Sequence, residues 1–460
     1  MNKIVKIIFV FAICLFESGF LDAQTITWQR TYGDNNIDYA YSIVQTPDEG
    51  YITVGQKRIQ TVNYIFAMRL NKYGDTIWTR TFPGFQANQI EKTSDGNFII
   101  ICAGNLIKIN INGETIWTKP GSSGTKLKET TDKGFVICLS SYNGPYLFYP
   151  KLKKVDSLGN IQWEKIYTEN IYDGRFSDIT IDSEGNYIMT GNYSDTAYTR
   201  DYLFIMKTDS MGNIFWLKKY EAYYYSASII VKDNDYYIGG SIGIAFLTKF
   251  NSSGNRIWLK FYDRGSEFSE SYGLTNTSDG GLVFTGTYRN ADYDYYVRLL
   301  KTNSDGEEQW RKLYGFGDAD LAYNVRQTSD SGYILSGIRE NYQLGDIFII
   351  KTDKTGFSNP PLLIDNNTEN PPVDFTLYQN FPNPFNPSTN IKFKIKKNSF
   401  VKITIYDIQG KKVKKIVDEQ KPAGEYQITF NGTNLPSGMY FYQLSINDIV
   451  RDTKKMILIN

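Results

Sequence analysis

A ten-residue pattern that occurs seven times constrains the fold of this chain more than any other feature. It reads basic-x-Asx-x-x-Gly-x-x-x-Trp, as in KTDSMGNIFW at residues 207–216. An Asp or Asn side chain can fold back onto the backbone that follows it, and glycine readily takes the positive φ that closes such a turn. Each copy therefore predicts a tight turn that leads into a β-strand. The basic, Asx and Gly positions are Arg69/Asn71/Gly74, Lys108/Asn110/Gly113, Lys154/Asp156/Gly159, Lys207/Asp209/Gly212, Lys249/Asn251/Gly254, Lys301/Asn303/Gly306 and Lys351/Asp353/Gly356.

The tryptophans of the chain belong to the same periodic device. Trp28 lies ahead of the first copy, each of the first six copies ends in a Trp, and Pro360 stands at that place in the seventh. A basic residue follows each Trp by two positions and shares its strand face, because side chains alternate along a strand. Large aromatic residues on such a face pack against a neighbouring sheet, so we interpret the tryptophans as core residues. The other six are Trp78, Trp117, Trp163, Trp216, Trp258 and Trp310.

The repeats are roughly 39–53 residues long and contain four strand-sized pieces, as a β-propeller blade does. In the fourth repeat these pieces are residues 175–182, 187–190, 202–207 and 214–220. Residues 28–33 form a fourth strand with no preceding three, while the last repeat has three strands and no fourth. We therefore predict an all-β chain whose residues 24–357 form a seven-bladed propeller, sealed when these two partial blades pair.

The repeats resemble those of secreted bacterial β-propellers of the pyrroloquinoline-quinone-like and WD-like kinds. That resemblance implies the architecture and no particular ligand. The turns are also similar to the Asp-box of sialidases, Ser-x-Asp-x-Gly-x-x-Trp. They depart from it by their longer spacing, Asp-x-x-Gly-x-x-x-Trp, and no arginine triad is identifiable, which argues against sialidase activity.

The connections between strands predict where a ligand would bind. The first and third connections of a blade emerge on one side, and here they are short Asx/Gly turns, whereas the connections on the opposite side vary, as at residues 56–63, 192–201, 287–294 and 338–345. Variable loops on a rigid scaffold commonly carry binding sites. Their Tyr and Arg residues suit a glycan or protein ligand, and the alternative is a solvated rim without a ligand. The candidate binding residues are Tyr193, Tyr198, Tyr288, Arg289, Tyr293, Arg339 and Tyr342.

Composition excludes several classes of function. The 460 residues include no histidine, which rules out His-dependent triads, His general bases and His-ligated metals. A formal net charge of +1 gives no electrostatic basis for binding nucleic acid. We expect no cofactor and no metal, since the acidic pairs Asp292/Asp294 and Asp318/Asp320 lack a full calcium-ligand loop.

Three functions remain open at this stage. The favoured one is a non-enzymatic binding protein. The second is a glycan hydrolase with two carboxylates, roughly 5–10 Å apart, near the centre of the ring. The third is a purely structural surface propeller.

The N-terminal residues 1–23 have the features of a secretory signal peptide: Lys3 and Lys6, an apolar run, and small residues up to Ala23. No later stretch is long and apolar enough to span a membrane. The mature chain keeps Cys102 and Cys138 in apolar, strand-like runs, where buried free thiols are favoured and a disulfide is the alternative. Residues 358–375 form a Pro-rich linker.

Residues 376–460 form a second β module, in which seven short strands predict an immunoglobulin-like sandwich. Its motifs NFPNPFNPST, IYDIQGKKV, LPSGMYFYQL and KKMILIN closely resemble the type A C-terminal sorting domain of the type IX secretion system. The resemblance implies that the signal peptide delivers the chain to the periplasm. The type IX machinery would then export it as a secreted or outer cell-surface protein. The sorting-signal residues would be Asn380, Phe381, Pro382, Asn383, Pro384, Gly410, Gly438, Lys455 and Met456.

Overall fold

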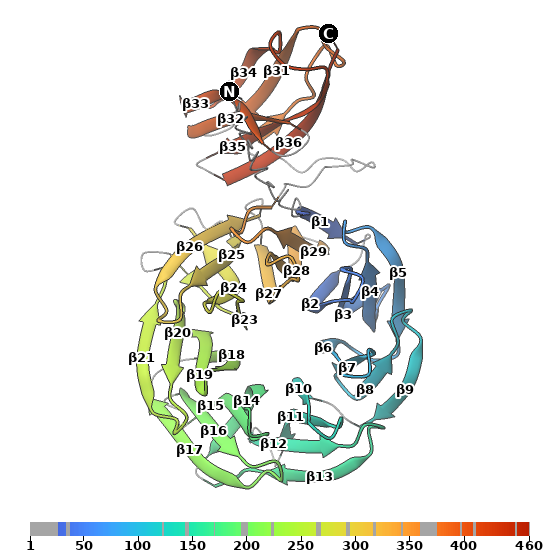
Figure 1. Ribbon diagram of the computed structural model, residues 1–460, viewed down its shortest axis with the longest axis vertical. Helices are drawn as coiled ribbons and strands as arrows, with labels where there is room; N and C mark the ends of the chain where they lie inside the picture. Colours follow the sequence, from blue (N-terminus) through green and yellow to red (C-terminus); the bar gives the residue numbers. More distant parts are fainter. Residues whose placement is uncertain are drawn as a thin grey trace, which may run out of the picture.

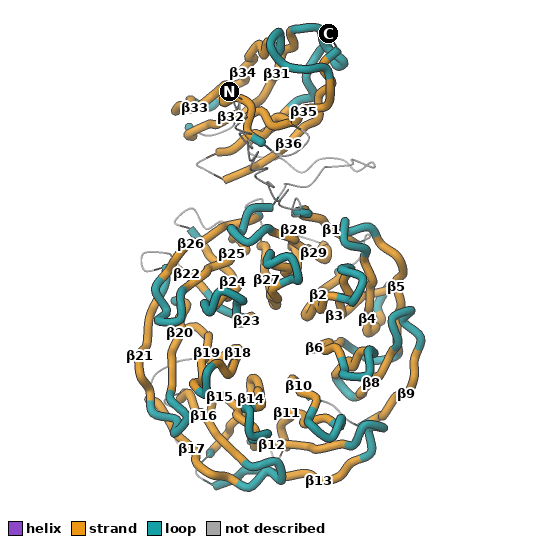
Figure 2. The backbone as a smooth tube through the Cα atoms, viewed as in Figure 1, coloured by secondary structure: helices purple, strands orange, loops and turns teal. Residues whose placement is uncertain are grey.

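The computed structural model describes most of the chain after the expected signal peptide. The described residues are 26–33, 37–121, 124–142, 147–169, 171–194, 201–221, 225–263, 268–290, 295–315, 319–341, 344–358, 375–395, 398–407, 411–446 and 449–459. The expected signal peptide and nearly all of the Pro-rich linker lie outside them. The described part is all-β and contains no helix, so no helix there could span a membrane (Figure 2).

Seven antiparallel sheets stand around a common axis as the blades of a propeller (Figure 1). We number them from β2 onwards; the innermost strand comes first in blades 1–6. Blade 1 contains β2 (Asp38–Gln45), β3 (Tyr51–Ile59), β4 (Val62–Leu70) and β5 (Thr76–Phe82). Blade 2 contains β6 (Ala87–Lys92), β7 (Phe98–Cys102), β8 (Asn105–Ile109) and β9 (Thr115–Pro120). Blade 3 contains β10 (Lys126–Glu129), β11 (Phe135–Tyr142), β12 (Phe148–Val155) and β13 (Ile161–Ile166).

Blades 4–6 continue the same strand order around the ring. Blade 4 contains β14 (Tyr172–Ile181), β15 (Tyr187–Ser194), β16 (Asp201–Thr208) and β17 (Ile214–Glu221). Blade 5 contains β18 (Tyr225–Lys232), β19 (Asp235–Ser241), β20 (Ala245–Phe250) and β21 (Arg256–Phe261). Blade 6 contains β22 (Phe268–Ser269), β23 (Gly273–Asn276), β24 (Leu282–Arg289), β25 (Tyr295–Thr302) and β26 (Glu308–Tyr314).

Blade 7 closes the ring with strands from both ends of the repeat region. Its order from the axis is β27 (Ala319–Gln327), β28 (Tyr333–Asn341), β29 (Leu344–Thr352) and then β1 (Trp28–Tyr32). β1 pairs antiparallel with β29, with Trp28 opposite Lys351. The predicted closure is confirmed, and β29 is left with no open outer edge of the kind that promotes aggregation.

The repeated turns have the chemistry that the sequence predicts. Asn71 Oδ1 accepts the backbone N–H groups of Tyr73 and Asp75, both at 2.9 Å. Gly74 then takes φ = +83°, which a residue with a Cβ adopts only under strain.

Each tryptophan packs over the turn glycine of the following blade. The half-buried Trp216 ring lies so close to Gly254 that a Cβ there would be 2.7 Å from it. The tryptophans thus join neighbouring blades, as predicted, although only Trp28 is buried and the other six are half-buried. The pairs are Trp28/Gly74, Trp78/Gly113, Trp117/Gly159, Trp163/Gly212, Trp216/Gly254, Trp258/Gly306 and Trp310/Gly356.

The basic residue of each pattern forms an ion pair that the sequence analysis did not predict. Its partner is an aspartate at or beside the first turn of the same blade, at 2.7–3.1 Å. Each pair ties the first turn of a blade to its third strand on the face that we call the turn face. The pairs are Arg69–Asp48, Lys108–Asp95, Lys154–Asp132, Lys207–Asp182, Lys249–Asp235, Lys301–Asp279 and Lys351–Asp330.

Two predicted loops on the opposite, loop face are largely regular structure. In residues 338–345, β28 and β29 stay paired as far as Asn341 opposite Leu344. Residues 56–63 were expected to form a variable connection, yet β3 and β4 run on as a hairpin with Ile59 opposite Val62. Only Gln60 and Thr61 remain as the connection, because Gln60 adopts φ = +56° and closes a two-residue turn.

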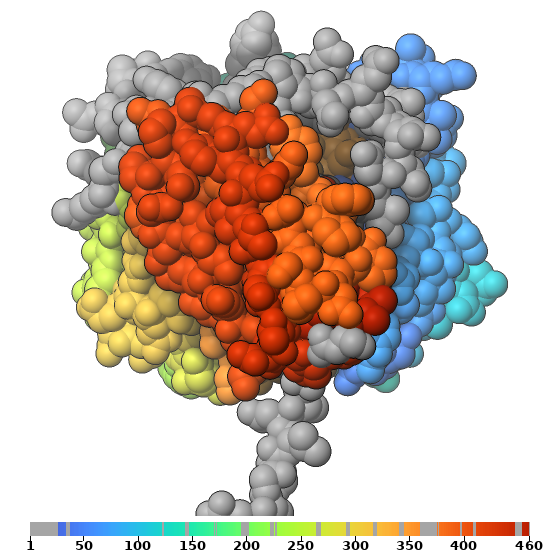
Figure 3. All heavy atoms as spheres, turned by 90° about the horizontal axis from the view of Figure 1, so that it is seen from above, coloured from blue at the N-terminus to red at the C-terminus, as the bar shows by residue number. Residues whose placement is uncertain are grey.

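The C-terminal module is a two-sheet sandwich, as predicted. One sheet has the order β30-β31-β34 and the other β33-β32-β35-β36. Their facing side chains, Ile403 and Tyr442 among them, form one buried core. Figure 3 shows the module from outside, coloured orange to red. The strands are β30 (Phe375–Leu377), β31 (Ser388–Ile395), β32 (Ser399–Asp407), β33 (Lys412–Lys421), β34 (Gly424–Asn431), β35 (Gly438–Ile446) and β36 (Ile449–Leu458).

Cys102 and Cys138 are buried free thiols, as favoured from the sequence. Cys102 lies in the core between blades 1 and 2, and Cys138 in the core between blades 3 and 4.

Candidate functional site

The innermost strands share an irregularity at the propeller axis. The register with the second strand shifts by one residue in β2, β6, β14, β18 and β27. In blade 6, the N–H of Tyr272 and the pairing of Gly273 both fall opposite Thr285. Such bulges re-aim a side chain out of the regular alternation and are frequent at functional sites. The extra residues are Tyr41, Asn88, Ser177, Ala227, Tyr272 and Tyr323.

Tyrosines at the bulges of three consecutive blades form a cluster. The Tyr323 ring of blade 7 lies 5.1 Å from Tyr41 of blade 1 and 5.6 Å from Tyr272 of blade 6, between ring centroids. Tyr39 stacks on Tyr41 at 5.5 Å with an interplanar angle of 6°. All four rings are half-buried, so solvent reaches part of each. We call these four residues the axial tyrosine cluster.

The bulges of blades 2 and 4 carry small polar residues instead. Asn88 Nδ2 donates to the Gly124 carbonyl at 2.8 Å, and its Oδ1 accepts from Gln86 Nε2 at 2.7 Å. Ser177 holds the bulge position of blade 4 and is also half-buried. The axis is therefore aromatic along blades 6, 7 and 1 and polar at blades 2 and 4.

An ion-pair network spans the axis toward the turn face. Arg326 of blade 7 reaches past blade 1 to Glu91 of blade 2 at 2.7 Å, and Lys128 of blade 3 contacts the same carboxylate at 2.9 Å. All three lie near the turn-face ends of β27, β6 and β10. Burial alone would raise the pKa of Glu91, but the two cations outweigh it and lower the pKa to about 2. Glu91 is therefore a carboxylate at neutral pH and cannot serve as a general acid.

A second acid near the axis, Asp178, seals the edge of an inner strand. Its Oδ2 accepts the N–H of Ile229 at 2.9 Å and the hydroxyl of Ser228 at 3.0 Å, both from blade 5. Gln89 does the same for the N–H of Leu127 at 2.8 Å. The carboxylates of Asp178 and Glu91 thus hold neighbouring blades together.

The candidate binding residues predicted from loop positions lie in three different blades. Tyr193 of β15 stacks on Tyr202 at 5.0 Å, within its own blade. Arg289 of β24 lies over Tyr295 at 5.6 Å, next to Tyr288. Arg339 lies opposite Asp346 in blade 7. Tyr198, Tyr293 and Tyr342 fall outside the described residues. A ligand role for these seven stays a prediction.

The axial tyrosines went unnoticed in the sequence, although a signal was present. Tyr41, Tyr272 and Tyr323 each precede by five residues the threonine that opens the next turn, namely Thr46, Thr277 and Thr328. That spacing places them at one structural position in three blades.

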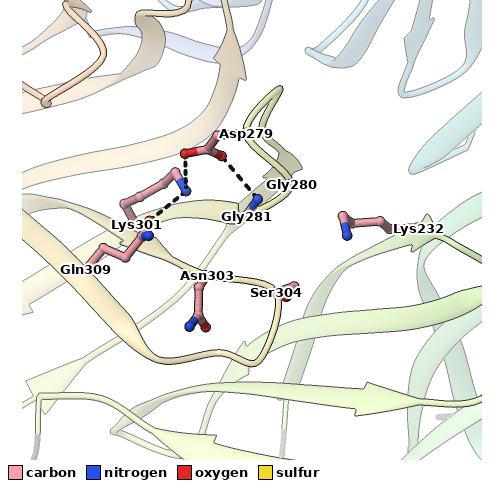
Figure 4. A pocket seen from close by; sticks show the side chains of 8 residues that line it. All are labelled: Lys232, Asp279, Gly280, Gly281, Lys301, Asn303, Ser304 and Gln309. Carbon is pink, nitrogen blue, oxygen red and sulfur yellow. Dashed lines mark hydrogen bonds and ion pairs between the residues drawn. The ribbon is translucent and has the colours of Figure 1, made fainter.

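A polar pocket of about 250 Å³ lies on the turn face between blades 5 and 6 (Figure 4). Blade 5 has a two-residue first turn there, Asp233-Asn234, with φ of +53° and +65°, where the other blades have longer turns. The shorter turn leaves space beside Lys301, whose ammonium is already bound by Asp279, Gln309 and the Thr302 carbonyl. Among the described residues no group of three or more acidic or cysteine side chains could hold a metal ion.

The described sorting-signal residues lie at one end of the C-terminal module. Asn380 is buried, whereas Phe381 is the most exposed large apolar side chain of the described chain. Gly438 begins β35 opposite Leu458, and Lys455 and Met456 belong to β36. Gly410 lies outside the described residues.

Comparison with known families matches residues 379–460 to the family described as "Secretion system C-terminal sorting domain". The chain therefore carries a type IX sorting domain, which indicates export to the cell surface or the medium. A comparison with curated proteins gives no match.

Solved structures similar to this chain share little of its sequence. The WD40 β-propeller domain of Doa1 is 11% identical with a TM-score of 0.48, covering 73% of this chain and 100% of its own. A Bacteroides caccae protein of unknown function is 13% identical with a TM-score of 0.41, covering 59% and 97%. The Neurospora crassa Pan2 WD40 domain is 10% identical with a TM-score of 0.43, covering 72% and 100%.

Proposed function

We propose that the propeller is a non-enzymatic ligand-binding module, carried out of the cell by its sorting domain, and that it binds its ligand at the axial tyrosine cluster. The domain limits that go with this proposal are residues 1–23 for the signal peptide, 24–357 for the propeller, 358–375 for the linker and 376–460 for the sorting domain.

The meeting of Tyr41, Tyr272 and Tyr323 from three blades is the observation that carries this proposal. Half-buried tyrosines offer a rigid apolar face and a polar hydroxyl at little entropic cost. The ion-pair network of Arg326, Glu91 and Lys128 spans the axis on the turn-face side. A ligand would therefore approach from the loop face, where β2 and β27 begin.

A glycan fits this surface best. Sugar rings present C–H faces that stack on tyrosine, and hydroxyl groups that pair with amides and hydroxyls such as those of Asn88 and Ser177. The charge of Glu91 is balanced by Arg326 and Lys128, and within the cluster the Tyr272 hydroxyl donates to Glu270, a carboxylate that can also accept a hydrogen bond from a sugar hydroxyl. A protein ligand that inserts an apolar side chain is the second candidate, favoured by the stacked pair Tyr39 and Tyr41.

Two acids near the axis, Glu91 and Asp178, are not available for hydrolysis, which favours a binding role. A glycosidase needs one protonated carboxyl group and a second, ionised one at a fixed separation. Glu91 is held ionised by its two cations, and Asp178 is occupied by the backbone of blade 5.

A glycan array probed with the full chain, followed by calorimetry on any hit, tests the proposal. Tyr323→Ala should weaken binding at least tenfold. Tyr73→Ala is the matched control, because Tyr73 is an exposed tyrosine on the turn face. Equal affinity of Tyr323→Ala and the native chain would exclude the axial site. If no glycan binds, but a protein binds the native chain and not Tyr323→Ala, then the location of the binding site is correct and the proposed class of ligand is wrong.

A further inference from the structure

The last strand of the chain is covered at its outer edge by the segment that opens the sorting domain. β36 ends sheet order β33-β32-β35-β36, so its outer edge has no neighbouring strand within that sheet. Residues 379–385 lie along that edge where β36 ends. Phe385 donates its N–H to the Ile457 carbonyl and accepts the N–H of Ile459, both at 2.9 Å. These two bonds flank Leu458 as a parallel bridge does.

The side chain of Asn383 repeats this bridge two residues earlier. Its Oδ1 accepts the N–H of Ile457 at 2.9 Å, and its Nδ2 donates to the Lys455 carbonyl at 3.3 Å. These two groups flank Met456 as the previous pair flanks Leu458. The amide of Asn383 thus takes the place of a backbone peptide in a segment whose prolines, Pro382 and Pro384, have no N–H to offer.

Further polar contacts of Gln379 and Asn380 hold the segment in place. Asn380 is 2% exposed; its N–H donates to the Tyr442 hydroxyl at 2.7 Å. Its Nδ2 donates to Thr389 Oγ1 at 2.9 Å, and Gln379 Nε2 donates to the Lys455 carbonyl at 2.6 Å. Residues 379–385 and 455–459 therefore form one folded unit, which we call the clasp.

Phe381 stands out from the clasp. It is 79% exposed, whereas Phe385 in the same segment is 2% exposed and belongs to the core. Its backbone exchanges two hydrogen bonds with Asn390 at 3.0 Å, so the ring is presented from a fixed backbone. An exposed aromatic ring on a rigid support is the typical anchor of a protein interface.

We propose that the secretion machinery recognises the clasp as a folded surface, with Phe381 as the apolar anchor and Asn383 as the residue that positions the end of β36. The partner is a folded component of that machinery with an apolar pocket for the ring. Basic residues outnumber acidic ones in residues 373–460, so acidic groups around that pocket would complement the module. This inference rests on the sorting domain and is independent of the propeller's ligand.

Four variants of the full chain, expressed in a bacterium with this secretion system, separate the two roles. For each, the exported fraction is measured by fractionation, and the hydrogen exchange of the Ile457 amide is measured on purified protein. Asn383→Leu should speed that exchange at least tenfold and lower the exported fraction at least fivefold. Asn383→Asp, which keeps the acceptor and loses the donor, should fall between Asn383→Leu and the native chain. Phe381→Ala should lower export as strongly while the Ile457 amide stays protected.

Asn386→Leu is the matched control, since Asn386 is an exposed asparagine in the same motif and should change neither quantity. Native export of Phe381→Ala would overturn the anchor. Native export of Asn383→Leu despite fast exchange at Ile457 would show that the clasp is not what the machinery reads. Because Phe381→Ala leaves the clasp bonds intact, it decides the question even if Asn383→Leu does not fold.

Discussion

On the turn face the blades of the propeller repeat one set of contacts, whereas at the axis they differ from one another. Every blade has the same ion pair on the turn face, and in every blade the glycine of the turn between the third and fourth strands lies under a tryptophan of the preceding blade. At the axis the bulge position carries Tyr in blades 6, 7 and 1 but Asn88 and Ser177 in blades 2 and 4. Contacts that repeat in every blade stabilise the fold of each blade. Positions that differ between blades are not constrained by that common requirement, so they can carry the function.

Removing β1 should break the repeated set most severely. Deletion of residues 24–35 takes away the outer strand of blade 7 and uncovers the edge of β29. We expect the propeller to unfold at a lower temperature and to associate through that edge. Calorimetry and light scattering check this outcome, and a monomer as stable as the native chain would contradict it.

Removing one inter-blade tryptophan should have the next largest effect. Trp216→Ala takes a half-buried ring away from Gly254 and from the core between blades 4 and 5. The expected loss is about 2–4 kcal/mol in the free energy of unfolding, below the range for a fully buried ring. Phe215→Ala is the control, because that neighbouring ring is exposed and its removal should cost under about 0.5 kcal/mol. If both variants lose the same free energy of unfolding, Trp216 is not one of the contacts that stabilise the propeller.

Acid should weaken the ring of ion pairs on the turn face. Burial alone would raise the pKa of Asp132, but the hydrogen bonds from Thr130 and Lys154 outweigh it and lower the pKa to about 2. The pKa values of Asp182, Asp279 and Asp330 are lowered in the same way. A lowered folded-state pKa gives stability that is present above the unfolded value of about 3.9 and lost as the pH falls through the folded value.

The melting temperature should therefore fall between about pH 4 and pH 2, as the turn aspartates are protonated. The double variant Asp132→Asn/Asp279→Asn should melt lower at neutral pH and show a shallower acid slope. An unchanged slope in that variant would assign the acid sensitivity to other carboxylates.

The axial position should have the smallest effect on stability. Tyr323→Ala removes a half-buried ring whose aromatic neighbours, Tyr41 and Tyr272, are also partly solvated. The expected cost is about 1 kcal/mol or less, because solvent can fill the space that the ring leaves. Chemical denaturation measures it, and a loss as large as that of Trp216→Ala would place the tyrosines in the structural set.

The sequence predicted those features of the fold and of the site that depend on residues close together in the chain. The Asn71 turn and the position of Trp216 were readable because they rest on residues within one short segment. The closure by β1 could be predicted because the N-terminal strand and the three-stranded last repeat together make one complete blade. The pair Lys301–Asp279 was not predicted, since its members were seen only as parts of separate turns. Tyr323 was missed because a bulge is a property of strand pairing that a period-two pattern does not show, and its only mark in the sequence is the five-residue spacing to Thr328.

The central claim is that the contacts repeated in every blade stabilise the fold, whereas the axial residues that differ between blades bind the ligand. The most direct test measures both unfolding and ligand binding for Trp216→Ala and Tyr323→Ala. Trp216→Ala should lose about 2–4 kcal/mol of stability and bind the ligand with native affinity at a temperature where it is folded. Tyr323→Ala should unfold like the native chain and bind at least tenfold more weakly. If Tyr323→Ala instead loses stability and keeps native affinity, the axis belongs to the scaffold and the central claim is wrong.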